Sequence, residues 1–232
     1  MKPFTLVALA IVGLASAVLT SSPATAHDVV IELYQSQGCS DCPPAEANLN
    51  AVADRPGVIA LSFGVTYWDQ LGWKDTFAQP RFTARQWDYA HALHHVDVFT
   101  PQVVVDGQRD GVGADPGAFA RLIHPDPVTP GAPALTLTAK TVTLGSGRAP
   151  ASGADIWLVR YDPRTLQVPI RSGENGGKTL PHRNIVRELL RLGVWTGKST
   201  TLALPATTDR VLRTAILVQA PGAGPILAAV KD

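Results

Sequence analysis

A proline-rich stretch at residues 124–133, HPDPVTPGAP, limits the architecture of this chain more than any other feature of its sequence. It holds four prolines in ten residues. Because proline has no backbone N–H, such a stretch sustains neither a helix nor an interior strand. The residues before it alternate strand and helix patterns, whereas those after it form β-branched runs between Gly and Pro turns. We therefore predict two domains, 27–124 and 134–232, joined by a proline-rich linker at 125–133.

The first half has the pattern of an α/β domain in the order β-α-β-α-β-β-α. Runs rich in β-branched and apolar residues predict strands at 28–34, 57–65, 101–107 and 109–112. Segments with helical character predict helices at 44–54, 79–95 and 115–124. In the second helix the expected apolar face consists of Phe82, Ala84, Trp87, Tyr89, Ala90 and Leu93. Alternation of this kind predicts a sheet covered by helices.

The second half has the pattern of antiparallel strands, at 134–144, 154–162, 199–206 and 213–230. We expect a mainly β, sandwich-like domain there. Residues 184–195, NIVRELLRLGVW, fit either a helix or a long strand.

A glycine-rich segment at 171–184 carries Glu174, Lys178, His182 and Arg183 but lacks the spacing of a phosphate-binding loop. It is either a plain hairpin tip or a segment that contacts the first domain or a partner.

Residues 1–26 have the three parts of an export signal. Lys2 gives a positive start, an apolar run follows at 4–19, and the small-residue cleavage motif Ala-Thr-Ala ends at Ala26. An uncleaved anchor is the alternative, but the run is shorter than the roughly 20 residues that a membrane span needs. We predict a periplasmic or secreted protein without stable membrane insertion after cleavage. Disulfides persist in that oxidising compartment.

The charge of the chain argues against a nucleic-acid partner. The formal net charge is +1, and 17% of the residues are charged. No basic field is therefore available to attract a phosphate backbone.

Cys39 and Cys42 are the two cysteines of the chain, and they follow the first expected strand at the start of the first helix. The helix dipole there favours an anion, so a Cys39 thiolate is stabilised relative to a free cysteine. Cys42 lies about one turn later, where it can resolve a mixed disulfide. Asp41, between them, either puts a carboxylate near the sulfurs or points to solvent. As a structural clip the pair is weak, since so short a loop gives about 2 kcal/mol against nearly 5 for a loop of 100 residues.

These elements, together with Thr100-Pro101 directly before the third strand, resemble the thioredoxin superfamily. The stretches 29–49, 66–86, 99–108, 172–180 and 184–189 are similar to an uncharacterised family of bacterial secreted thioredoxin-like proteins. The resemblance implies a thioredoxin-like first domain with a cis peptide bond before Pro101. It also implies that Thr100 and Pro101 face the cysteines, hold the substrate strand and keep metals off the thiols.

The cysteine pair predicts a thiol-disulfide oxidoreductase in which Cys39 attacks and Cys42 resolves. Its partners would be proteins or small thiols and disulfides, with no cofactor, because the cysteines carry the electrons. The insert at 66–80 starts where the second strand ends, at the edge that lines the crevice of open α/β sheets. Its residues Trp68, Asp69 and Trp73 either wall the site and select partners or form a lid that packs on the core.

Two other classes of function stay open. A copper-binding protein would use Cys39 and Cys42 with His91 and His95, which are four residues apart on one helix face, because thiolate and imidazole suit Cu(I). A domain that kept the fold without the chemistry is the other class. Glu32 on the first strand is either a buried acid for proton transfer or an exposed residue, and we expect it to be exposed.

Overall fold

The computed structural model describes residues 28–124 and 129–232. The predicted signal peptide at 1–26, and residues 125–128 of the predicted linker, lie outside these ranges. Among the described residues, no helix is both long enough and apolar enough to span a membrane.

The first half has the element order that the sequence predicts. The elements are β1 (Val29–Gln35), α1 (Cys42–Val52), β2 (Val58–Gly64), the 3-10 turn η1 (Asp69–Leu71), α2 (Pro80–Ala92), β3 (Gln102–Val105), β4 (Arg109–Gly111) and α3 (Pro116–Leu122). Each α-helix has at least one proline within its first three residues, where a backbone N–H would have no partner in the helix. The Asp115 carboxylate caps α3 by accepting a hydrogen bond of 2.7 Å from the Ala118 N–H.

All the regular elements of the described second half are strands. They are β5 (Leu135–Leu137), β6 (Thr141–Leu144), β7 (Ala154–Asp162), β8 (Leu166–Pro169), β9 (Thr179–His182), β10 (Ile185–Trp195), β11 (Thr200–Ala203), β12 (Arg213–Gln219) and β13 (Ile226–Lys231). The segment that fits a helix or a strand is therefore the long strand β10.

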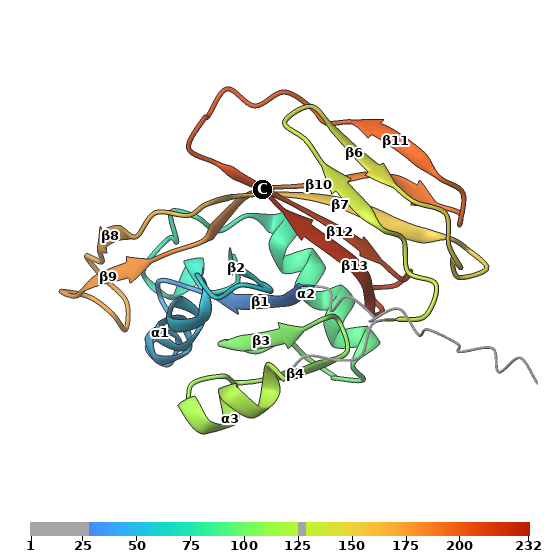
Figure 1. The fold of residues 1–232 in the computed structure, drawn as a ribbon. Coiled ribbons are helices and arrows are strands. Elements are labelled where there is room, and N and C mark those ends of the chain that lie inside the picture. The colour runs from blue at the N-terminus through green and yellow to red at the C-terminus, as the bar shows by residue number, and fades with distance from the viewer. Residues whose placement is uncertain (1–27, 125–128) are drawn as a thin grey trace, which may run out of the picture.

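The two halves of the chain share one large mixed sheet. Its eight strands lie in the order β13-β12-β7-β10-β2-β1-β3-β4 (Figure 1). The junction is a parallel pairing of β10 with β2, at Ile185 opposite Ser62. The change in sequence pattern at the proline-rich stretch thus separates two parts of one continuous sheet.

A second layer covers the far end of this sheet. The three-stranded sheet β11-β6-β5 packs there on residues of β7, β12 and β13, with Trp195 fully buried between the layers. The result is a local two-sheet sandwich (Figure 1). At the other end, helices cover the sheet: α1 and α3 pack with Ile31 and Leu33, and α2 packs with Tyr34 and Phe63.

Two predictions about side-chain burial are wrong. Ala84 and Trp87 are exposed on α2, whereas Arg85 is 4% exposed and Glu32 is 1% exposed. Because β1 is a central strand covered on both faces, Glu32 has no path to solvent, and Arg85 neutralises it across 2.9 Å. Arg85 also donates to the Tyr89 hydroxyl at 3.0 Å. The buried side of α2 thus holds the charged Arg85, whereas the helical periodicity predicts the apolar Ala84 there.

Candidate functional site

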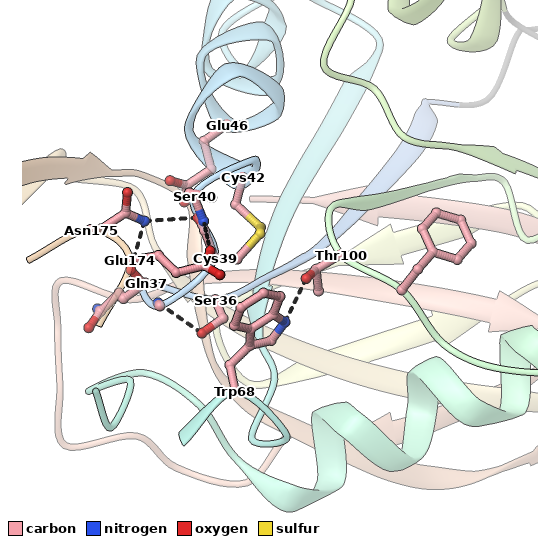
Figure 2. Close-up of a disulfide and its surroundings, with 12 residues drawn as sticks. Ser36, Gln37, Cys39, Ser40, Cys42, Glu46, Trp68, Thr100, Glu174 and Asn175 are labelled. Carbon is pink, nitrogen blue, oxygen red and sulfur yellow. Dashed lines mark hydrogen bonds between the residues drawn. A yellow bond between two sulfur atoms is a disulfide. The ribbon is translucent and has the colours of Figure 1, made fainter. Parts of the chain in front are cut away.

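The two cysteines form a disulfide in the turn between β1 and α1. The Cys39 N–H donates to the Ser36 carbonyl at 3.0 Å, and the Cys42 N–H donates to the Cys39 carbonyl at 3.3 Å. The two Cα atoms are 5.5 Å apart. Cys42 is the first residue of α1, so the disulfide lies at the helix N-terminus and at the carboxyl end of β1 (Figure 2).

Both cysteines are buried, although the residues between them are not. Cys39 and Cys42 are each 1% exposed, whereas Ser40 and Asp41 face solvent. The exposure of Asp41 agrees with its solvent-facing alternative. Other segments of the chain must therefore cover the sulfur atoms.

One cover comes from the second half of the chain, at the tip of the β8–β9 hairpin. Asn175 is fully buried, and its side-chain amide donates to the backbone carbonyls of Gln37 at 3.0 Å and Cys39 at 2.8 Å. The Ser40 N–H donates to the Glu174 carboxylate at 3.1 Å (Figure 2). Hydrogen bonding from the Ser40 side chain, together with this bond from its backbone, lowers the pKa of Glu174. The glycine-rich segment thus contacts the first half of the chain, which was one of its two alternatives.

A second cover comes from the insert between β2 and α2. The indole N–H of Trp68 donates to the Thr100 hydroxyl at 2.7 Å, and that of Trp73 donates to the Gln37 side-chain carbonyl at 2.9 Å. Both aromatic residues therefore border the cysteine turn, and Trp68 also packs on the core cluster that contains Tyr34 and Phe63, as expected of a lid. Asp69 does not join them, because its carboxylate accepts the Asp75 N–H at 3.0 Å and folds the insert itself.

The Thr100–Pro101 peptide bond is cis. Antiparallel pairing of β3 with β1 puts Gln102 opposite Tyr34. Buried Pro101 precedes Gln102, so it lies next to the end of β1, where the cysteine turn begins. Figure 2 shows Thr100 and Trp68 on the side of the disulfide away from Asn175.

Glu46, one helical turn after Cys42 on α1, belongs to a buried group of two acids and a histidine. His182 Nδ1 is 2.7 Å from Glu46 Oε1, and both side chains are buried. Burial raises the pKa of Glu46, and the bond to His182 only partly offsets it. Burial works to lower the pKa of His182, but the hydrogen bond and charge of Glu46, with the charge of Asp75, outweigh it and raise that pKa. Burial also raises the pKa of Asp75.

The structure does not bring the histidines of the copper alternative to the cysteines. His95 Nε2 lies 2.8 Å from the Asp110 carboxylate, and the His91 ring lies beside Trp87. Within residues 28–124 and 129–232, no three His, Cys, Asp or Glu side chains are grouped so as to hold a metal ion. Cleavage after Ala26 would give His27 an amino-terminal amine that could chelate copper together with its imidazole, but His27 lies outside the described residues.

Sequence reasoning missed Glu46 and Asn175. Glu46 follows Cys42 by one helical turn on an otherwise apolar helix face, and this spacing is a signal that the sequence does contain. Asn175 lies in the glycine-rich segment, but its contact with the Cys39 carbonyl spans 136 positions. No local pattern reports such a contact.

Comparisons with known proteins identify a family but no activity. Residues 30–219 match the family model described as "Protein of unknown function (DUF1223)". No curated protein matches the chain in sequence. An X-ray structure of a protein from Agrobacterium tumefaciens is similar, with a TM-score of 0.72, 28% identity, and 89% of this chain and 94% of that chain covered. HBP35 of Porphyromonas gingivalis shares the fold, with a TM-score of 0.56, 16% identity, and 89% and 75% of the two chains covered.

Proposed function

From its own geometry we propose that this chain, which belongs to the DUF1223 family of proteins of unknown function, is a thiol-disulfide oxidoreductase. The observation that carries the proposal is the Cys39–Cys42 disulfide at the first strand-to-helix turn. A bond across so few residues adds about 2 kcal/mol of stability in the chain-entropy model. It is therefore poorly suited to a purely structural role, and reversible opening is the better explanation.

The arrangement of the first half supports a thioredoxin-like fold. Strands β2, β1, β3 and β4 are neighbours in that order, with β1 and β2 parallel and β3 antiparallel to β1. Helices α1 and α3 lie on one face and α2 on the other. In a sheet of this kind the crevice at the carboxyl ends of the parallel strands is the usual site of chemistry. The cysteine pair lies at that end of β1.

The chemical step transfers two electrons between a protein dithiol and a disulfide. In the reducing direction, the Cys39 thiolate attacks one sulfur of a substrate disulfide and expels the other substrate sulfur as a thiolate, which takes up a proton. The Cys42 thiol then loses its proton and attacks the Cys39 sulfur. This second attack closes the Cys39–Cys42 disulfide and releases the remaining substrate sulfur as a thiolate. Reversal of both steps oxidises a substrate dithiol.

The proposal includes export to the periplasm or the outside of the cell. It rests on the charged, apolar and small-residue parts of residues 1–26. Proteins or small molecules with thiols or disulfides are the proposed partners. Trp68 and Trp73, which border the cysteine turn, are the proposed contacts for them.

Trapping of the mixed disulfide tests the proposal. Reduced Cys42→Ser protein should form a stable adduct with a disulfide-containing peptide, seen by mass spectrometry, because Cys39 attacks and nothing resolves the adduct. The matched Cys39→Ser variant should form at least tenfold less adduct. The proposal fails if the two variants behave alike, or if the wild type exchanges no faster than the Cys39→Ser/Cys42→Ser double variant.

A further inference from the structure

We propose that Glu46 and His182 form a buried proton-transfer pair that gives a proton to the Cys42 sulfur when the disulfide opens and removes it when the disulfide closes. The inference rests on the proposed function and adds two residues to it. Glu46 is the group next to Cys42, and His182 is a positioning residue that acts through Glu46.

The first support is the placement of Glu46 on α1. It follows Cys42 by four residues, so the two side chains share one helix face at neighbouring positions. Both belong to the buried residues of α1, and Glu46 is 4% exposed. Figure 2 shows Glu46 one turn beyond Cys42 on the same helix. Glu46 is the one acid of α1, and this spacing makes it a neighbour, on the same buried face, of the cysteine whose sulfur leaves or attacks during exchange.

The second support is the contact across the two halves of the chain. His182, on β9, is fully buried and meets Glu46 at 2.7 Å, 136 positions away in sequence. Its Nε2 atom is buried without a hydrogen-bond partner among the described residues. Buried ring nitrogens in a purely structural pair are normally both satisfied. His182 therefore commits one ring nitrogen to Glu46 and reaches it from the second half of the chain.

The charges around the pair favour a retained proton. Besides Glu46, the ionisable group that acts on His182 is Asp75, on the loop before α2. Asp75 accepts hydrogen bonds from the backbone N–H groups of Gln37, Phe77 and Ala78, which hold its carboxylate in place. The Phe77 ring packs edge-to-face on the His182 ring, with centroids 5.7 Å apart. Two acids and one buried imidazole therefore share a site from which water is largely excluded.

The proton balance of the step is simple. When a thiolate attacks the Cys39 sulfur, the Cys39–Cys42 bond breaks and Cys42 leaves with the electron pair. The Glu46–His182 pair supplies one proton to that sulfur and becomes more negative by one charge. In the reverse direction the pair takes the proton from the Cys42 thiol, and the resulting thiolate attacks the Cys39 sulfur. The attacking thiol supplies the electrons in each direction, so no further reactant is needed.

The test is the pH dependence of disulfide reduction by dithiothreitol in the full-length protein, followed by Trp fluorescence or alkylation. Each rate is divided by the fraction of dithiothreitol present as thiolate. We expect the normalised wild-type rate to fall at least tenfold between pH 5 and pH 9, as the pair loses its proton. Glu46→Gln should give a flat profile. His182→Gln should shift the fall to higher pH, because the hydrogen bond and the charge of His182 lower the pKa of Glu46.

Asp88→Asn is the matched control, because Asp88 is an exposed carboxylate on α2, the helix on the other face of the sheet from α1. It also removes one negative charge and should leave the profile unchanged. A variant that only loosens the segments covering the disulfide should change the reduction rate by the same factor at every pH, so the shape of the pH profile stays the same. A flat wild-type profile overturns the inference even if Glu46→Gln does not fold. In that event, adduct formation by Cys42→Ser still decides the proposed function separately.

Discussion

The side-chain amide of Asn175, on a hairpin from the second half of the chain, donates a hydrogen bond of 2.8 Å to the backbone carbonyl of Cys39. Together with the bond from the same amide to Gln37, it holds the β8–β9 hairpin over the cysteine turn. The second half of the chain thus builds part of the site whose cysteines come from the first. We expect access to the disulfide to depend on this contact.

Asn175→Ala should speed the reduction of the disulfide. The substitution removes both bonds and leaves the buried Gln37 carbonyl without that donor, which costs about 1–3 kcal/mol, whereas the Cys39 carbonyl still accepts from the Cys42 N–H. We expect the hairpin to loosen and the rate of reduction by dithiothreitol at pH 7 to rise about tenfold, an opening free energy of about 1.4 kcal/mol. Arg171→Ala, an exposed change on the same segment, is the control. Equal rates for all three proteins would show that the hairpin does not limit access.

Trp68→Phe tests whether the insert selects partners. Phenylalanine keeps an aromatic ring but loses the bond to the Thr100 hydroxyl. We expect the rate of exchange with a disulfide-containing peptide to fall at least fivefold. The rate of reduction by dithiothreitol should change less than twofold, because so small a thiol does not depend on contacts with the Trp68 ring. The readout is the ratio of the two rates. A parallel fall in both rates would assign Trp68 to packing instead of recognition.

The Glu46–His182 pair should make folding stability depend on pH. Both pKa values are raised in the folded protein, so it binds more protons than the unfolded chain. The stabilisation is therefore present below the unfolded pKa values and is lost as pH rises through the folded ones. We expect a lower guanidinium midpoint for the oxidised protein at pH 8.5 than at pH 5.5, and a smaller difference in His182→Gln.

This window avoids the opposite effect of three other carboxylates. Asp54, Asp162 and Glu174 have lowered pKa values, so their contributions are lost only as pH falls below about 4. A wild-type midpoint that is unchanged or higher at pH 8.5 would contradict the assigned protonation of the pair.

Arg85→Met should destabilise the protein strongly. Arg85 and Glu32 are 4% and 1% exposed, and removal of one partner leaves an uncompensated buried charge, a loss of about 3–5 kcal/mol. The double variant Arg85→Met/Glu32→Gln should recover more than half of that loss. Denaturant titrations of the wild type, the single variants Arg85→Met and Glu32→Gln, and the double variant measure the coupling between the two charges. Additive effects would mean that the two charges do not depend on each other in the core.

The sequence predicts local elements of this fold far better than the long-range contacts of the site. All strands and helices of the first half follow from periodicity and from prolines at helix starts, since these signals are local. The pairing of β10 with β2 cannot be predicted that way, because it joins Ile185 in the second half of the chain to Ser62 in the first. The prediction that Glu32 is exposed is wrong for the same reason, because its neutralising partner, Arg85, lies 53 positions away.

The site divides along the same line. The cysteine turn and the Thr100-Pro101 position follow from motifs and resemblance, and Trp68 and Trp73 follow from their place after β2. The hairpin cover and the Glu46–His182 pair depend on contacts between the halves, for which no spacing rule exists.

The reduction potential of the Cys39–Cys42 disulfide is the most direct test of the central claim. Equilibration of the protein in buffers of reduced and oxidised glutathione or dithiothreitol, followed by thiol alkylation and mass spectrometry, measures it. An exchange catalyst should have a potential between about −120 and −270 mV, the range of known disulfide oxidoreductases. A potential below about −300 mV, typical of structural disulfides, would contradict the account.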